Sequence, residues 1–382
     1  MITGQEERVL NILLAPNAFK GSLTAHRTAL AMQEGILRVG RLPNGVLLRP
    51  VLAPLADGGD GTLETLVSAT GGTLTTTEVR DPLGRAVLAR WGRLGGERQN
   101  TAVIEMAEAN GLRLLRREER SPRTTSTFGT GQLMLAAVEA GCTQLLIGIG
   151  GSATNDGGAG MAQALGVRLL DREGKELPLG GSSLERLSRV DVSGFRLPKT
   201  VRVMVACDVN NPLCGSEGAS AVYGPQKGAD AEDVAILDAA LRHYGEVLRA
   251  QLGADVAERE GAGAAGGLGA GLMAFCGAEV RSGIELVMEV TGFEERLAEC
   301  HLVLTGEGQI DGQTGRGKVI AGVAKRAKAR GLPVIALAGS IVEGAEALLR
   351  SEGLTAVVSI LDAPCGLEEA MSRAYPLIAD ST

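Results

Sequence analysis

The chain has 382 residues, of which 45% are hydrophobic, 22% charged and only 2% aromatic, and it contains 55 glycines. This composition is typical of a globular protein, and the length allows two or three domains at ~100–200 residues each. The formal net charge of −7 and the single Trp91 argue against a nucleic-acid-binding protein, which needs a basic face and aromatic rings on which bases stack.

The N-terminal residues MITGQEERVL lack the apolar core of a signal peptide, and no run of ~18 apolar residues predicts a membrane span. We therefore expect a cytoplasmic protein without membrane or nucleic-acid partners, in which a homodimer is neither demanded nor excluded. The six cysteines form no C-x-x-C pair and the three histidines form no cluster. These patterns favour reduced, buried thiols over a metal site made of cysteine or histidine.

Strand and helix patterns alternate at both ends of the chain. Residues 8–16 and 46–53 predict strands, and residues 23–38 and 62–69 predict helices. At the C-terminal end the pattern predicts strands at 301–308, 332–340 and 355–361 and helices at 317–331, 343–353 and 366–380. Such alternation indicates a parallel sheet that is covered on both faces.

The middle of the chain follows a different pattern. Residues 71–110 show short alternating runs with turns at 81–85 and 94–98, which predict a mixed or antiparallel sheet. A strand at 200–209 and a long amphipathic helix at 230–253 follow.

We therefore predict an α/β protein with two domains. Residues 1–64 and 286–382 form one discontinuous domain with a parallel sheet, and residues 65–285 form an inserted mixed α/β domain. No proline-rich or serine-rich linker marks the boundaries.

The first candidate site is a glycine-rich stretch, GIGGSATNDGGAG, at residues 148–160. Gly148, Gly150 and Ala153 fit the dinucleotide fingerprint G-x-G-x-x-A, and Asp171 follows at the distance of a ribose-binding acid. However, the segment TNDGG delays the helix that should meet a pyrophosphate, and the chain offers no evident hydride-transfer machinery. The stretch is a dinucleotide site, a tight strand-to-helix crossing, or a cradle of backbone N–H groups for a phosphate or substrate. The residues of such a cradle would be Gly150, Gly151, Ser152, Thr154, Asn155 and Asp156.

The strongest chemical signal is TGEGQIDGQTGRGK at residues 305–318. Gly312, Gly317 and Lys318 fit G-x-x-x-x-G-K, but Val319 replaces the Ser or Thr that an ordinary P-loop offers to Mg²⁺. Two carboxylates in a glycine-rich loop, followed by a lysine at a helix start, are parts that phosphoryl transfer requires. A solvated loop is the alternative. Candidate phosphate contacts are Gly306, Glu307, Gly308, Thr314 and Gly317, and candidate Mg²⁺ ligands are Glu307 and Asp311.

Two further loops follow predicted strands, which is where α/β sheets bind ligands. The loop APNAFKGSL at 15–23 offers Lys20 and Ser22 to a carboxylate or phosphate, unless Lys20 is an ordinary surface lysine. The loop PLADGGDGT at 54–62 is a candidate substrate site or a turn in which Thr62 caps the next helix. Its candidate substrate contacts are Asp57, Gly58, Gly59 and Asp60.

Residues 206–229 predict a long loop after a strand, and loops of this length in compact domains are usually functional. Asp208 at its start is a candidate base or Mg²⁺ ligand, while Tyr223, Gln226 and Lys227 offer polar groups. The stretch GAGAAGGLGAG at residues 261–271 suits either close packing or the approach of a phosphate.

Six motifs, in this order and over nearly the whole chain, resemble those of the type-1 glycerate kinase family. They are APNAFKGSLTA, PLADGGDGT, GIGGSATNDGGAGM, ACDVNNPLCGSEGASAVYGPQKGA, GAGAAGGLG and LTGEGQIDGQTGRGK. The resemblance implies a two-domain α/β protein with a flavodoxin-like domain that uses ATP and Mg²⁺ to phosphorylate D-glycerate in glyoxylate, glycolate or sugar-acid catabolism. It implies 2-phosphoglycerate as the product, with 3-phosphoglycerate as the alternative. The family usually carries Glu at the position of Asp60, which keeps the charge but shortens the reach.

On this basis we predict an active site in the cleft between the two domains. Lys318 and its loop would hold the ATP phosphates, and Asp208 or Asp311 would coordinate Mg²⁺ and orient the glycerate hydroxyl. Lys20 and Ser22 would bind the glycerate carboxylate. Two alternatives are an NAD-linked dehydrogenase built on the Gly148 loop and a non-catalytic glycerate-sensing protein, which would bind glycerate without releasing ADP.

Overall fold

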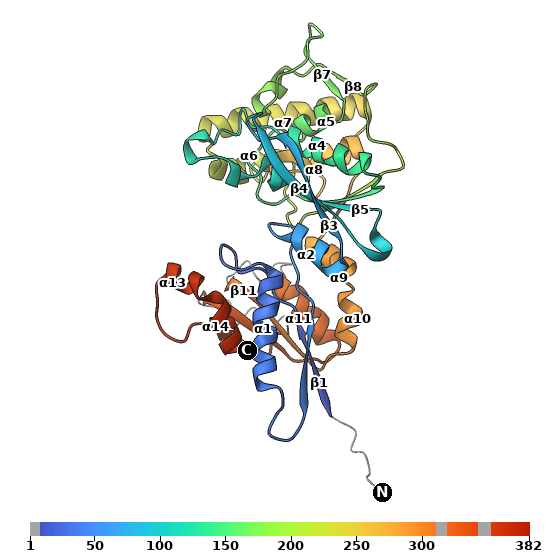
Figure 1. Ribbon diagram of the computed structural model, residues 1–382. Coiled ribbons are helices and arrows are strands. Elements are labelled where there is room, and N and C mark those ends of the chain that lie inside the picture. Colours follow the sequence, from blue (N-terminus) through green and yellow to red (C-terminus); the bar gives the residue numbers. More distant parts are fainter. Residues whose placement is uncertain (1–7, 311–318, 343–352) are drawn as a thin grey trace. The chain divides into compact units, whose positions relative to one another are not determined.

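The structure, a computed structural model, describes residues 8–310, 319–342 and 353–382. Its internal contacts divide the chain into two units, each of which is described by itself (Figure 1). Unit 1 comprises Met1–Asp57 and Ile284–Thr382, and unit 2 comprises Gly58–Gly283. The sequence places the first boundary after residue 64 and the second after residue 285. Every helix in the described ranges is too short or too polar to cross a bilayer.

Unit 1 is built on a five-stranded sheet in which all strands are parallel. Side by side, the strands are β2 (Leu47–Leu52), β1 (Val9–Leu14), β11 (Leu302–Ile310), β12 (Val334–Ile341) and β13 (Ala356–Ser359). Counted within the unit, this is the order 2-1-3-4-5 of flavodoxin-like folds. The topological switch point of the sheet therefore lies between β1 and β11.

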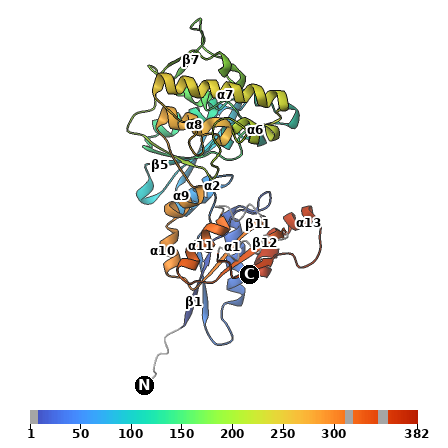
Figure 2. The ribbon, with the colours of Figure 1, turned by 180° about the vertical axis from the view of Figure 1, so that it is seen from behind.

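Helices cover both faces of this sheet (Figures 1 and 2). On one face α1 (Ala25–Val39) packs against α14 (Ala374–Ser381), so closely that a Cβ on Gly35 would lie 2.3 Å from the carbonyl oxygen of Ala379. On the other face lie α9 (Gly283–Thr291), α10 (Phe293–Ala298) and α11 (Val319–Ala329). Leu13 and Leu14 of β1 point to opposite faces and are both fully buried, as expected for a sheet covered on both sides.

Two predictions for unit 1 are wrong in detail. The expected last helix, residues 366–380, is two helices, α13 (Leu367–Ser372) and α14. Pro376 explains the break, because it has no N–H to continue the helical bonding to Ser372. The strand expected at 301–308 continues to Ile310 as part of β11. Most of the helix expected at 343–353 lies outside the described residues.

Unit 2 is built on a six-stranded mixed sheet, as the sequence predicts. In spatial order, the strands are β10 (Glu279–Arg281), β9 (Arg202–Ala206), β6 (Gln144–Gly148), β5 (Thr101–Glu105), β4 (Ala86–Arg93) and β3 (Thr73–Arg80). The four strands from β10 to β5 are parallel, whereas β4 and β3 are antiparallel to their neighbours. The carboxyl ends of four strands therefore meet at one edge.

The helices of unit 2 are α2 (Thr62–Thr70), α3 (Met106–Asn110), α4 (Phe128–Glu139), α5 (Ala159–Ala164), α6 (Ala219–Tyr223), α7 (Ala231–Leu252) and α8 (Ala264–Cys276). Short 3-10 turns occupy Gly96–Arg98, Leu112–Leu114, Arg117–Glu119, Gly181–Arg186 and Pro225–Lys227, and a separate two-stranded sheet joins β7 (Arg168–Leu170) to β8 (Arg189–Asp191). The predicted helix 230–253 is confirmed: Asp230 caps α7 by accepting a hydrogen bond from Asp233 N–H. Residues 206–229 are not one long loop, because they contain α6 and a 3-10 turn.

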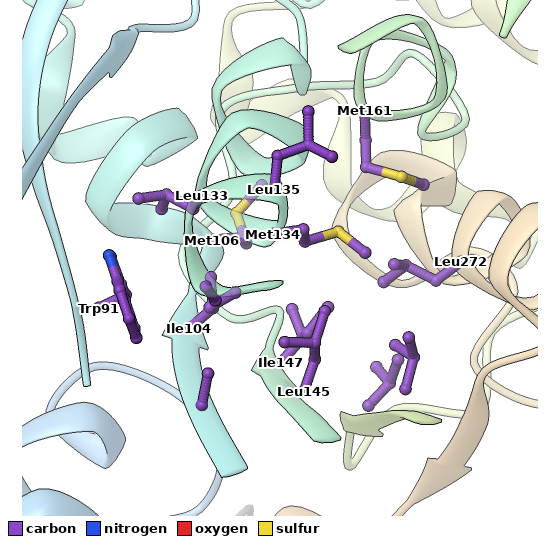
Figure 3. Packing of buried hydrophobic residues seen from close by; sticks show 14 of the residues in the cluster. Trp91, Ile104, Met106, Leu133, Met134, Leu135, Leu145, Ile147, Met161 and Leu272 are labelled. Carbon is purple, nitrogen blue, oxygen red and sulfur yellow. The ribbon is translucent and has the colours of Figure 1, made fainter. Parts of the chain in front are cut away.

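The main core of unit 2 lies between the mixed sheet and its helices. Figure 3 shows Ile104 of β5 and Leu145 and Ile147 of β6 facing Leu133 and other apolar side chains of α4. Trp91 of β4 borders the same cluster and is only 2% exposed. The alternating apolar residues that predict these strands are thus the residues that bury their inner face.

Candidate active site

Unit 1 contains a cavity of about 690 Å³ at the carboxyl end of its parallel sheet. Its lining comes from the loop after β1, the end of β11, the end of β12 and the segment after β13. Because the switch point lies between β1 and β11, this is where a doubly wound sheet is expected to bind a ligand.

The loop after β1 places Lys20 at this cavity. Phe19 and Leu23 exchange backbone hydrogen bonds across the loop, and Ser22 Oγ donates to the Met371 carbonyl oxygen at 2.7 Å. Gly21, at φ +78°, makes this tight turn possible. Lys20 is exposed at the tip, whereas the Ser22 hydroxyl already ties the loop to α13. Both side chains line the cavity, as does Asp57.

The end of β11 supplies Glu307 and Gly308 to the same cavity. Glu307 is only 8% exposed. Gly308 and Gly339 of β12 approach closely, so that a Cβ on Gly339 would lie 2.7 Å from the Gly308 carbonyl oxygen. Gly306 does not line the cavity, because its Cα faces β12, where a Cβ would lie 2.4 Å from the Leu337 carbonyl oxygen. The other predicted residues of this motif, Asp311, Thr314, Gly317 and Lys318, lie outside the described residues.

Unit 2 has a second candidate region at the carboxyl edge of its sheet. The strand register aligns Glu105, Gly148, Ala206 and Arg281, which end four neighbouring parallel strands. This edge corresponds to the edge of the unit 1 sheet at which the cavity lies, where sheets of this kind are expected to bind ligands.

The Gly58–Gly61 turn packs directly onto this edge. A Cβ on Gly148 would lie 2.6 Å from the Gly58 carbonyl oxygen, and a Cβ on Gly150 would lie 2.9 Å from the Gly59 Cα. These glycines therefore allow two glycine-rich segments to touch, which supports the tight-crossing interpretation. Thr62 is not the predicted cap: it is the first residue of α2, and its hydroxyl donates to the Gly59 carbonyl oxygen.

The sequence analysis missed Glu105, a buried carboxylate at this edge. Glu105 is 5% exposed, and its Oε1 accepts a hydrogen bond from Leu63 N–H at 2.7 Å. Burial raises the pKa of Glu105 to about 7, and the charges of Asp60 and Glu108 act in the same direction. The sequence contains a signal for it, because Glu105 directly follows the apolar residues AVI of its strand, and Asp208 likewise follows a strand.

Glu108, three residues later, is a carboxylate with the opposite behaviour. Burial acts to raise the pKa of Glu108, but hydrogen bonds from Arg90 and Arg113 outweigh it and lower the pKa to about 2. Glu108 therefore stays ionised near Glu105 and helps to keep Glu105 protonated near neutral pH. Two neighbouring carboxylates thus have well-separated pKa values, as acid and base groups of active sites often do.

Asp208 follows β9 and is exposed. Its Oδ1 accepts hydrogen bonds from Ser282 Oγ and Gly283 N–H, both at 2.9 Å. These bonds tie the β9 loop to the residues that follow β10 in the same unit and fix the orientation of the carboxylate.

The interior of the Gly148–Gly160 stretch differs from the prediction. Thr154, Asn155 and Asp156 are completely buried, and Ser152 is 7% exposed. Asp156 accepts hydrogen bonds from Thr127 N–H and from Gly158 and Gly160 N–H at 2.8 to 3.2 Å. The four polar side chains are therefore enclosed by the protein. Between Gly148 and Gly160, only Gly150 and Gly151 are not buried.

A buried lysine supports the same stretch. Lys227 is 1% exposed, and its Nζ donates to the Thr154 carbonyl oxygen at 2.7 Å. Burial lowers the pKa of Lys227 to about 7, against the opposing effect of the Asp156 charge. The sequence analysis presents Lys227 as a polar group of a loop. In the structure it is buried and stabilises the Gly148–Gly160 stretch through this hydrogen bond.

The dinucleotide interpretation of the Gly148 stretch is wrong. Asp171 follows β7, which pairs with β8 in a separate sheet rather than beside β6. Its Oδ1 accepts hydrogen bonds from Glu173 N–H and Lys175 N–H in an exposed turn. A ribose-binding acid should end a strand next to the fingerprint strand.

The candidate metal ligands are dispersed over the two units. Among the described residues, no three His, Cys, Asp or Glu side chains cluster to form a metal site. Asp57 and Glu307 both line the cavity of unit 1, and one or two carboxylates suffice for Mg²⁺ when substrate phosphates complete its shell. The residues present therefore fit a metal that arrives with a phosphate ligand.

Comparisons with known proteins identify the family of this chain. The model of the glycerate kinase family matches residues 12–382. A glycerate kinase of Halalkalibacterium halodurans is 48% identical over 96% of this chain and 95% of its own length, and a glycerate 2-kinase of Escherichia coli K12 is 47% identical over 96% and 94%. A crystal structure of a Salmonella typhimurium LT2 protein, provisionally named glycerate kinase 2, covers 98% of this chain and 96% of its own with a TM-score of 0.86 and 45% identity. This chain belongs to the glycerate kinase family.

Proposed function

We propose that this protein transfers the γ-phosphoryl group of ATP to D-glycerate and releases ADP and 2-phosphoglycerate. The observation that carries the proposal is the similarity over 96% of the chain to relatives named glycerate kinase and glycerate 2-kinase. Polar and charged groups at the carboxyl edges of both sheets support it, because phosphoryl transfer depends mainly on positioning and on charge stabilisation.

The chain supplies cations and carboxylates for this reaction. Lys20 lines the cavity of unit 1, and we propose that it and Lys318 neutralise phosphate oxygens. Asp57 and Glu307 would hold Mg²⁺ together with the phosphates, with Asp208 and Asp311 as the further candidate ligands. When bound, Mg²⁺ would neutralise charge that develops on the phosphate oxygens.

The acceptor hydroxyl needs a carboxylate that orients it or takes its proton. In unit 2 the candidates are Asp208, at the end of β9, and Glu105, at the end of β5. A pKa of about 7 suits Glu105 to proton transfer near neutral pH. We propose Glu105 as the base. Asp208 keeps the role that the sequence analysis gives it, which is to orient the glycerate hydroxyl.

An assay of ADP release tests the proposal. The purified protein should release ADP from ATP when D-glycerate is present, and only with Mg²⁺, whereas L-glycerate serves as the matched control substrate. Binding of glycerate without ADP release would instead identify a sensing protein, and glycerate-dependent reduction of NAD would identify a dehydrogenase.

A ¹³C and ³¹P NMR spectrum of the product then decides between 2-phosphoglycerate and 3-phosphoglycerate. We further propose a role in glyoxylate, glycolate or sugar-acid catabolism. The cytoplasmic location and an active site in the cleft between the units stay predictions, and a homodimer is neither demanded nor excluded.

A further inference from the structure

We infer that the cavity of unit 1 holds the adenine nucleotide, with the base against the segment after β13 and the phosphates toward β1 and β11. The inference rests on the proposed function and deepens it, because it assigns one of the two substrates to one unit. It agrees with the phosphate contact proposed above for Lys20, in place of the glycerate contact that the sequence predicts.

The first argument is size. The cavity encloses about 690 Å³, which falls within the ~300–1,000 Å³ of pockets that bury drug-sized ligands. A three-carbon acid would occupy a small part of this space and leave the rest to water. A nucleotide has the bulk to fill it.

The second argument is the distribution of polar and apolar groups. The apolar lining comes mainly from one segment of the chain, residues 360–374, which contributes Leu361, Leu367 and Met371. The polar lining comes from the carboxyl ends of β1 and β11, where Lys20 and Gln309 lie. A nucleotide has the same division, because its base presents flat apolar faces and its phosphates need cations and hydrogen-bond donors.

The third argument is that, among the described residues, both parts of the lining have groups that the protein does not cover or pair. Leu367 is 77% exposed at the apolar part, although covering such a side chain is favourable by about 25 cal/mol for each Å² removed from water. At the polar part, Asn17 is only 4% exposed and its Oδ1 accepts from Ala18 N–H. Within the part of the chain that the structure describes, its Nδ2 has no acceptor, so this amide donor is available to a ligand in the cavity.

Glycines complete the floor of the cavity. Gly308 and Gly339 bring the ends of β11 and β12 together without side chains, so a ligand can approach the backbone. Glycerate would then bind at the other candidate site residues. These include the carboxylates at the edge of the unit 2 sheet.

The test places a large side chain in the apolar part of the cavity. Ala370 lies on α13 and lines the cavity, whereas Ser372, on the same helix, is exposed and does not line it. Ala370→Trp should raise the dissociation constant of ADP, measured by calorimetry without glycerate, and the KM for ATP by about tenfold or more. The KM for glycerate should stay the same, and Ser372→Trp should leave all three constants unchanged.

A labelling experiment on the wild-type protein gives an independent readout. Cys365 lines the cavity and is partly exposed, so its alkylation, followed by mass spectrometry of the peptide, should slow when ADP is present and not when glycerate is present. This readout holds even if the tryptophan variant does not fold.

The possible outcomes separate the inference from the proposed function. Protection of Cys365 by ADP in a protein that does not phosphorylate glycerate would support the inference and refute the proposed function. An active glycerate kinase in which glycerate alone protects Cys365, or in which Ala370→Trp folds and raises only the KM for glycerate, would overturn the inference. No protection of Cys365 by ADP in an active enzyme would overturn it as well.

Discussion

Replacing Glu105 with glutamine should change how the stability of unit 2 depends on pH. Burial, assisted by the charges of Asp60 and Glu108, raises the pKa of Glu105 from its ordinary value of 4.5 to about 7. Below pH 4.5 the folded and unfolded chains both carry the proton. As the pH rises from 4.5 to 7, the unfolded chain releases this proton while the folded chain keeps it, so the wild-type protein loses stability across this window.

The size of this loss follows from the two pKa values. The gap between a pKa of 4.5 and one of about 7 corresponds to about 3 kcal/mol, at 1.36 kcal/mol for each pH unit. The glutamine side chain is neutral at every pH and still accepts the hydrogen bond from Leu63 N–H. The variant should therefore gain up to this amount over the wild-type protein above pH 7 and nothing below pH 4.5.

The chain offers a specific probe for this measurement. Trp91 is the only tryptophan and is buried in the core of unit 2, so its fluorescence reports the unfolding of that unit. Urea unfolding between pH 4.5 and 8 gives the free energy of unfolding for each protein. Glu78→Gln is the matched control, because it removes the same charge from an exposed position of β3 in the same sheet.

The difference between Glu105→Gln and the wild-type protein should grow with pH, and Glu78→Gln shows what the removal of an exposed carboxylate from the same sheet does by itself. Parallel curves for Glu105→Gln and the wild-type protein would refute the reasoning. The activity supplies a second check: if Glu105 is the base, kcat/KM should rise through a pKa near 7 in the wild-type protein, and the variant should lose this limb.

Three further predictions concern unit 2. Asp208→Asn keeps the acceptor for Ser282 and Gly283 but loses the charge, so we expect kcat to fall by about 10²-fold in the ADP-release assay; full turnover would remove Asp208 from the mechanism. Gly266→Ala should lower the free energy of unfolding by at least about 2 kcal/mol, because its Cβ would lie 1.9 Å from the Thr154 carbonyl oxygen. Gly253→Ala has a similar positive φ and no atom within 4 Å, so it should cost only about 1 kcal/mol, and equal losses in the two variants would contradict the packing argument. Burial lowers the pKa of Lys227 from 10.5 to about 7, so the wild-type protein should lose stability as the pH falls from 10.5 to 7, and Lys227→Met should lose stability less steeply over this window in the same fluorescence measurement.

Local patterns predicted most elements because each element buries its own apolar residues. In α7, Leu237, Leu241, Tyr244 and Leu248 lie at helical spacing and are all buried, and Gly253 ends the helix in the left-handed conformation. In β1, consecutive leucines predict a strand covered on both faces. Pro376 is also visible in the sequence, and the break that it causes was within reach of the same rules.

The candidate site was predicted in part. The rule that ligands bind after parallel strands led to Lys20, Asp57 and Glu307, which do line one cavity. The same rule would also have predicted Glu105 as a site residue. However, an acid at the end of an apolar run is equally typical of the solvent-exposed end of a strand. Only its 5% exposure distinguishes the two.

The sequence by itself determined the alternation of strands and helices, the family and the loops that carry polar groups, because these follow from neighbours in the chain. Only the tertiary structure decided which polar groups face a cavity and which face protein. Thr154 and Asp156 look like ligand contacts in a glycine-rich stretch, yet Lys227 and Thr127, distant in sequence, enclose them. Burial and the resulting pKa values depend on atoms brought together from remote parts of the chain, and no local pattern encodes that enclosure.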